Sequence, residues 1–160
     1  MTEKDELLKT LNARRGFLRF TARNLTDEQA RMATTPSVLT IGGLVKHVTG
    51  VERRWMLFAV GGAEAMEADP IDWVGQFTMT ESETLDGLLA EYEQVAAQTN
   101  ELVGTLDLDA GHPLPEKPWH EKGASWTNRQ VLLHLIGETS HHSGHADIIR
   151  EAIDGQKTMG

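Results

Sequence analysis

The chain has 160 residues, about the length of one globular domain. Apolar residues make up 39% and charged residues 24%, proportions that are typical of a folded protein and argue against disorder. The formal net charge of −9 disfavours nucleic acid or an anionic membrane as a partner. The absence of cysteine excludes disulfides, Cys-ligated metal sites and a thiol nucleophile supplied by the protein itself.

Two features of the sequence bear on where the protein resides. Residues 1–6 are too charged for the apolar region of a secretory signal. No stretch approaches the ~18 consecutive apolar residues that a membrane span requires. We therefore expect a soluble, cytoplasmic protein that forms a single domain over residues 1–160.

Helical periodicity predicts two long helices and one short helix in the first half of the chain. The first long helix covers about residues 3–24, where leucines and a phenylalanine recur at helical spacing. A capping box predicts a short helix over residues 26–32. The second long helix is expected to begin near Ser37 or Thr40 and to end at the Gly61-Gly62 pair.

The second half of the chain predicts two further long helices. The third begins at Thr80, whose side chain can form a capping box with the glutamate three residues later, and continues to about Leu106. The fourth runs from Ser125 or Thr127 to Ala152, just before a glycine stop signal.

Two longer connections, residues 61–79 and 107–125, separate these helices. Three prolines forbid a helix in the second connection. The chain shows no internal repeat and no run of alternating β pattern. Four long helices around one core predict an all-α four-helix bundle with one or two long crossover loops.

The most informative local feature is a group of histidines in the fourth predicted helix: His134, His141, His142 and His145. At about 100° per residue, all four lie within about 60° of Glu138 on the helical wheel. Val131 and Ile149 fall on the same arc. The imidazoles and the carboxylate therefore share the face that should turn toward the core.

The second long helix places one histidine, His47, in its own apolar stripe. A bundle that turns both stripes inward brings His47 toward Glu138 and His142, which are i, i+4 neighbours on one face. Two neutral nitrogens and one anionic oxygen suit a catalytic zinc with an open fourth position. The same donors also suit a non-haem iron facial triad.

A structural interpretation of these residues competes with metal binding. A lone histidine in an apolar stripe is commonly a hydrogen-bonded core residue, and Arg53 or Arg54 could neutralise Glu138. A buried carboxylate needs such a partner, because leaving it unpaired is costly. The concentration of four histidines around Glu138 favours metal binding, although the order of residues is not the His-Glu-x-x-His pattern of metalloproteases.

Two stretches carry a family resemblance: residues 40–55 (TIGGLVKHVTGVERRW) and residues 126–151 (WTNRQVLLHLIGETSHHSGHADIIRE). On these motifs the chain resembles the DinB/YfiT-like superfamily of four-helix metalloproteins, and within it the mycothiol S-transferase branch. The resemblance implies metal ligands at His47, Glu138 and His142. The chain departs from the family pattern at two positions. His145 stands where a glutamine is commonest, and an extra histidine, His141, makes a second i, i+4 pair with His145.

The resemblance also implies a function. A zinc ion, or another divalent metal, would bind the thiol of mycothiol and activate it to attack a small electrophilic substrate, a detoxification reaction. Bacillithiol or glutathione would need the same metal. His145 is then a candidate catalytic proton acceptor or substrate contact, and His134 a supporting or core residue. A homodimer is consistent with the resemblance.

Three other functions remain open on the sequence. The same site could serve a metal-dependent hydrolase or isomerase, or an iron oxygenase, or the polar cluster could only fix the packing of a non-enzymatic bundle. Trp119 and His120 in the proline-rich connection, and Trp73 in the earlier one, either line a substrate pocket or pack as surface loops on the bundle.

Overall fold

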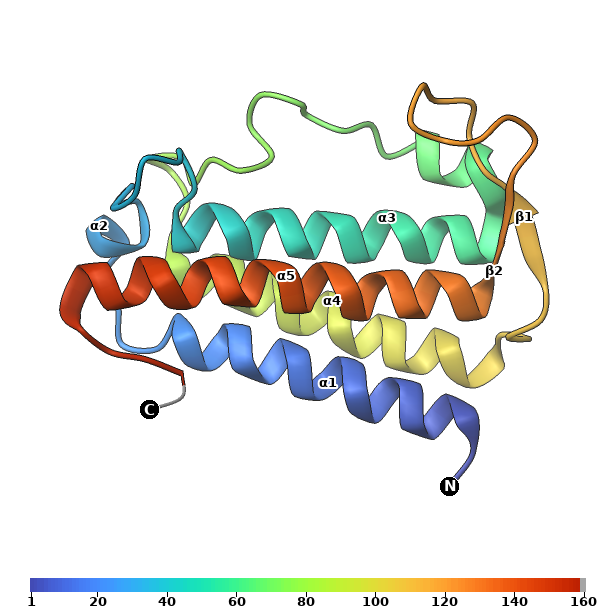
Figure 1. The fold of residues 1–160 in the computed structure, drawn as a ribbon, viewed down its shortest axis with the longest axis horizontal. Helices are drawn as coiled ribbons and strands as arrows, with labels where there is room; N and C mark the ends of the chain where they lie inside the picture. The colour runs from blue at the N-terminus through green and yellow to red at the C-terminus, as the bar shows by residue number, and fades with distance from the viewer. Residues whose placement is uncertain (159–160) are drawn as a thin grey trace.

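The structure, a computed structural model, describes residues 1–158 and is built around four long helices (Figure 1). A short helix and a two-stranded antiparallel sheet complete it. The elements are α1 (Glu3–Thr21), α2 (Asp27–Ala30), α3 (Ile41–Glu67), α4 (Leu85–Thr105), β1 (Gly111–Pro113), β2 (Ser125–Thr127) and α5 (Asn128–Asp154). The all-α four-helix bundle predicted from the sequence is confirmed. None of the described helices is long and apolar enough to cross a membrane.

The order of helix directions explains the long crossover loop. Figure 1 shows α3 and α4 running in the same direction, with α1 and α5 running the opposite way. Residues 68–84 must therefore return along the length of the bundle before α4 can begin. This crossover connection passes over the α3 side of the molecule (Figure 1).

Threonine side chains begin the described helices. Thr2, Thr26 and Thr127 form complete capping boxes, in which the side chain accepts from a first-turn N–H and the third residue reaches back. Thr40 and Thr84 cap α3 and α4 with their hydroxyl oxygens. Since each cap satisfies an otherwise unpaired N–H group, the sequence fixes these starting points locally.

Helix α3 differs from the prediction at its C-terminal end. The helix was expected to stop at Gly61-Gly62, but it is only interrupted there and continues to Glu67. Gly62 adopts φ 73°, a conformation that favours glycine. A Cβ atom at this position would also lie 3.2 Å from Nδ1 of His112, so the kink lets β1 approach the helix closely.

Helix α4 begins later than predicted, at Leu85 instead of Thr80. The expected contact between Thr80 and Glu83 exists, since the Thr80 N–H donates to Oε2 of Glu83 at 2.7 Å, but it closes a turn. The Glu83 carboxylate pairs instead with Lys46 of α3 at 2.9 Å. The capping pattern therefore anchors the crossover connection to α3.

The structure contains one short β ladder for which no alternating pattern is present in the sequence. β1 and β2 pair antiparallel in the register Gly111 to Thr127 and Pro113 to Ser125. Each strand has three residues, which is too short for an alternating pattern to be visible in the sequence. The ladder fixes the base of the proline-rich connection at the start of α5.

A buried ion pair separates the two halves of the core. Arg15 of α1 and Glu52 of α3 are 0% and 1% exposed. Their side chains form a bidentate pair with nitrogen–oxygen distances of 2.5 and 3.1 Å. Asn12 and Asn100 accept from the remaining guanidinium nitrogen of Arg15. On both helices the pair lies between the two apolar clusters of the core.

We expect Arg15→Met to lower the free energy of unfolding by about 3–5 kcal/mol, because it leaves the Glu52 carboxylate buried without its partner. Urea denaturation would measure the loss. The double variant Arg15→Met/Glu52→Leu should recover much of it. Lys157→Met, which removes the half-exposed pair with Glu151, is the control and should cost less than about 1 kcal/mol. A cost that small for Arg15→Met would contradict the prediction.

Candidate metal centre

Three side chains from two helices converge where the inner faces of α3 and α5 meet. Oε2 of Glu138 lies 3.8 Å from Nε2 of His47 and 3.5 Å from Nε2 of His142. One ligand atom from each residue lies within 4.8 Å of the other two. The two Glu138 distances exceed those of ordinary hydrogen bonds but approach the ~3.4 Å that separates ligands on a tetrahedral zinc ion. The structure thus brings together all three predicted ligand residues.

The crossover connection fixes the orientation of His47. Nδ1 of His47 donates a hydrogen bond to the amide oxygen of Gln76 at 3.1 Å. The Phe77 ring stacks on the imidazole with a centroid distance of 3.9 Å. Because the proton is on Nδ1, the lone pair of Nε2 faces the Glu138 carboxylate. A cation between them, either a metal ion or the added proton of a protonated His47, would satisfy both acceptors.

His142 has a neighbour of its own on α5. Its Nδ1 lies 3.3 Å from Nδ1 of His145, so one imidazole donates to the other. Burial, together with His141 and His142, lowers the pKa of His145 and favours its neutral form. A neutral His145 can accept from Nδ1 of His142, which leaves Nε2 of His142 free on the side of Glu138. This is the usual way in which an outer partner orients a histidine ligand.

Glu138 remains ionised in this environment. The adjacent imidazoles of His142 and then His47 lower the pKa of its carboxyl well below the ordinary value, against the opposing effect of burial. The alternative neutralisation of Glu138 by Arg53 or Arg54 is not seen. Arg53 pairs with Asp69 and Glu91 at 2.9 and 3.1 Å, and Arg54 forms no ion pair within the described residues.

The remaining histidines lie outside this group of three. His134 lies one turn before Glu138 and packs against Trp55 and Trp126 with centroid distances of 4.9 and 5.2 Å. His141 is exposed, although its ring lies 4.5 Å from that of His145. The predicted inward arc therefore holds for His142 and His134 and fails for His141, which is at the edge of that arc.

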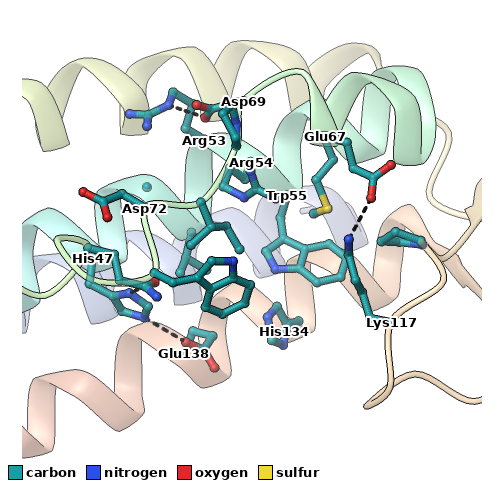
Figure 2. Close-up of a pocket in the computed structure, with 18 of the residues that line it drawn as sticks. His47, Arg53, Arg54, Trp55, Glu67, Asp69, Asp72, Lys117, His134 and Glu138 are labelled. Atoms are coloured by element: carbon teal, nitrogen blue, oxygen red, sulfur yellow. Dashed lines mark hydrogen bonds and ion pairs between the residues drawn. The ribbon is translucent and has the colours of Figure 1, made fainter.

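A cavity of about 660 Å³ opens in front of His47 and Glu138 (Figure 2). Its floor is formed by α3 and α5, and its walls by the crossover connection and the proline-rich connection. Much of its lining is apolar or aromatic: Val51, Trp55, Met66, Pro70, Ile71, Trp73, Pro115, Trp119 and Trp126. Such a cavity with a few convergent polar groups is typical of a site for small molecules.

Both loops that the sequence left undecided contribute to this cavity. Trp73, Trp119 and His120 line it. The rings of Trp73 and Trp119 contact each other edge to face at 5.7 Å, so the two connections meet beside the cavity. A second bridge pairs Lys117 with Glu67 at 3.0 Å (Figure 2). The interpretation of these loops as pocket walls is the one that the structure supports.

Sequence reasoning missed several residues around the centre. Gln76 carries no motif, and its contact with His47 spans 29 residues. Trp55 and Trp126 stack at 4.7 Å across the cavity lining, although both tryptophans belong to the motifs that carry the family resemblance. Their positions in those motifs were the only available signal.

The arrangement offers two nitrogen donors, one carboxylate and an adjacent cavity. This donor set fits a divalent ion with at least one coordination position left for a ligand from the cavity. The chain has no cysteine, so any thiolate ligand there must come from a small molecule.

Comparison with known proteins agrees with this geometry. No curated protein shows significant sequence similarity to the chain. A solved structure described as a conserved protein of locus from Enterococcus faecalis has the same fold, with a TM-score of 0.66. It is 18% identical and the alignment covers 98% of this chain and 99% of that one. The model of the mycothiol-S-transferase family matches residues 6–155. The chain therefore belongs to the mycothiol-S-transferase family, whose members are named for transfer to or from a small thiol.

Proposed function

We propose that the protein is a zinc-dependent S-transferase that conjugates mycothiol to a small electrophile in the cytoplasm. The observation that carries this proposal is the convergence of His47, Glu138 and His142, the first two of which line an apolar cavity. Family membership supplies the thiol, and the cavity offers room for the second substrate.

The ligand residues fit zinc in number and chemistry. Two imidazoles and one carboxylate are a common protein ligand set for catalytic zinc, which keeps a fourth position open. When bound, the ion would lower the pKa of a coordinating thiol and so supply a nucleophile at neutral pH. The negative charge of Glu138 would partly offset the charge of the ion.

The other residues of the centre orient the ligands and exclude water. Gln76 holds His47 in the tautomer that exposes Nε2, and His145 does the same for His142 if it accepts from Nδ1. The tryptophans of the cavity would hold the electrophile against the centre. In the reaction, the sulfur forms a bond to an electrophilic carbon, its proton passes to solvent or a base, and the leaving group departs with its bonding electron pair.

We propose His145 as a candidate proton acceptor. Its contact with Nδ1 of His142 supports a positioning role as well, and it is not among the residues that line the cavity. A His145→Gln variant separates the two roles, because a glutamine oxygen can accept from His142 but does not titrate.

Metal content is the first expected outcome. The protein purified without a His tag should hold about one zinc per chain by mass spectrometry of the metal. Glu138→Gln and His142→Ala should lose it, because each removes one of three ligands. His141→Ala is the matched control, since it removes a neighbouring exposed imidazole and should keep the metal. Retention of the ion in both ligand variants would move the site to His141 and His145, and iron in place of zinc would favour oxygen chemistry.

The orienting contact to His47 gives a second prediction. Gln76→Leu should weaken zinc binding by about ten- to a hundredfold, which is typical for the loss of a hydrogen-bond partner of a ligand. A competition titration with a fluorescent zinc chelator would measure it. Gln76→Glu keeps an acceptor at the same place and should keep the affinity. Equal affinities for wild type and Gln76→Leu would show that the contact does not position the ligand.

Activity gives the third prediction. With mycothiol and 1-chloro-2,4-dinitrobenzene, the zinc-loaded protein should release chloride and form the thioether faster than the uncatalysed reaction. Glu138→Gln and added chelator should return the rate to background, and glutathione in place of mycothiol tests the choice of thiol. Full activity in a metal-free variant would refute the scheme. Turnover of a substrate without any thiol would instead indicate a hydrolase.

A further inference from the structure

Arg54 is an arginine at the cavity that has no hydrogen-bond or ion-pair partner within residues 1–158. It lies on α3 and lines the cavity, between Trp55 and Asp69 in Figure 2. Nη1 of Arg54 is buried and has no hydrogen-bond acceptor among residues 1–158. A buried donor that is left unpaired is destabilising and uncommon in folded proteins, so each such group calls for an explanation.

The other cations of the cavity lining are already neutralised. Lys46 pairs with Glu83 at 2.9 Å, Arg53 with Asp69 at 2.9 Å, and Lys117 with Glu67 at 3.0 Å. Within the described residues, Arg54 is the cavity-lining cation that no carboxylate contacts. Burial is the largest effect on the pKa of Arg54 and lowers it, and the negative charges of Asp69 and Glu67, which form no ion pair with Arg54, oppose this effect only in part. An anion that enters the cavity would give the guanidinium a partner in direct contact.

The surroundings of Arg54 define the rest of such a ligand. Its sequence neighbour Trp55 stacks on Trp126, so a flat aromatic surface lies beside the guanidinium. Val51, one turn before Trp55, extends this apolar lining toward His47 and Glu138. Such a surface favours a planar, apolar body, because aromatic rings gain most from stacked or edge-to-face contacts.

The position of Arg54 relative to His47 defines the length of the ligand. The two residues are seven apart on α3, which places them on the same face and roughly 10 Å apart along the helix axis. One molecule in the cavity can therefore contact both residues. Its reactive carbon would lie beside His47 and Glu138, while a substituent on its far side reached the guanidinium.

We propose that Arg54 recognises an anionic group on the electrophilic substrate, which is therefore a planar, apolar molecule with a carboxylate, sulfonate or phosphate substituent. That the ligand is the electrophilic substrate rests on the proposed function. The anion site itself requires neither the metal nor the transfer reaction. Arg54 is a specificity-determining residue in this scheme. The guanidinium turns its free donors toward the anion, as the planar fork of arginine does in bidentate pairs.

Two fluorescent probes test the anion site without any turnover. 8-Anilinonaphthalene-1-sulfonate is a planar aromatic anion, and N-phenyl-1-naphthylamine has the same aromatic body without the sulfonate. We expect Arg54→Gln to weaken binding of the sulfonate by about ten- to a hundredfold and to leave the neutral probe nearly unchanged. Arg54→Lys, which keeps the charge but loses the fork, should fall between wild type and Arg54→Gln. Circular dichroism would verify that each variant is folded.

Lys46→Gln is the matched control for charge. It removes one positive charge from the same cavity, but its ammonium group is already paired with Glu83, which does not act on Arg54. An equal loss of sulfonate binding in Lys46→Gln and Arg54→Gln would reduce the effect to general electrostatics and overturn the proposal. So would an Arg54→Gln variant that binds both probes as wild type does, or one that only raises the KM for mycothiol. Because the probes report binding alone, absence of transferase activity would refute the proposed function and leave this result interpretable.

Discussion

Polar side chains on the inner faces of a helical bundle must find partners there, because an unpaired buried charge costs several kcal/mol. The structure meets this constraint in two different ways. Arg15 and Glu52 form a closed network in which every strong donor and acceptor of the pair is satisfied inside the core. His47, Glu138 and His142 are arranged differently: their acceptor atoms face one another beside an open cavity. The Arg15 and Glu52 pair is thus satisfied within the protein, whereas under the proposed function a metal ion would complete the group of His47, Glu138 and His142.

The crossover connection contacts both the group of His47, Glu138 and His142 and the cavity. Because α3 and α4 run in the same direction, residues 68–84 have to travel back along the bundle (Figure 1). That path delivers Gln76 and Phe77 to His47 and places Trp73 in the cavity wall. The same segment thus orients a ligand and shapes the space in front of it. Changes in its sequence would affect both metal affinity and substrate choice.

The predicted ligand residues and the cavity walls come from different kinds of segment. The ligand residues lie on α3 and α5, where packing and an i, i+4 spacing hold them rigidly. The aromatic and charged groups that would meet the electrophile come partly from two irregular connections. Arg54 is an exception, since it is a helix residue. Under our proposal, its guanidinium, which has no partner among residues 1–158, would give the site a preference for anionic substrates.

Local sequence patterns predict much of the secondary structure of this protein. Threonine caps fixed the starts of α1, α2, α3 and α5, and the arc shared by Glu138 and His142 identified the inner face of α5. Local signals misplaced the start of α4, because the contact between Thr80 and Glu83 satisfies a turn as well as it satisfies a helix. They also missed β1 and β2, since the ladder depends on a partner 16 residues away at Gly111 and Thr127.

The sequence by itself therefore determined the helices, the bundle and the residue types of the centre, because periodicity and capping act over a few residues. The tertiary structure decided which side chains pair with these residues. The partner of Arg15 is 37 residues away, and that of His47 is 29 residues away. Arg54 forms no ion pair within the described residues because Asp69, Glu67 and Glu83 pair with other cations. Charge pairing across the chain is a competition among many candidates, and only the folded arrangement of the backbone settles which pairs come within reach.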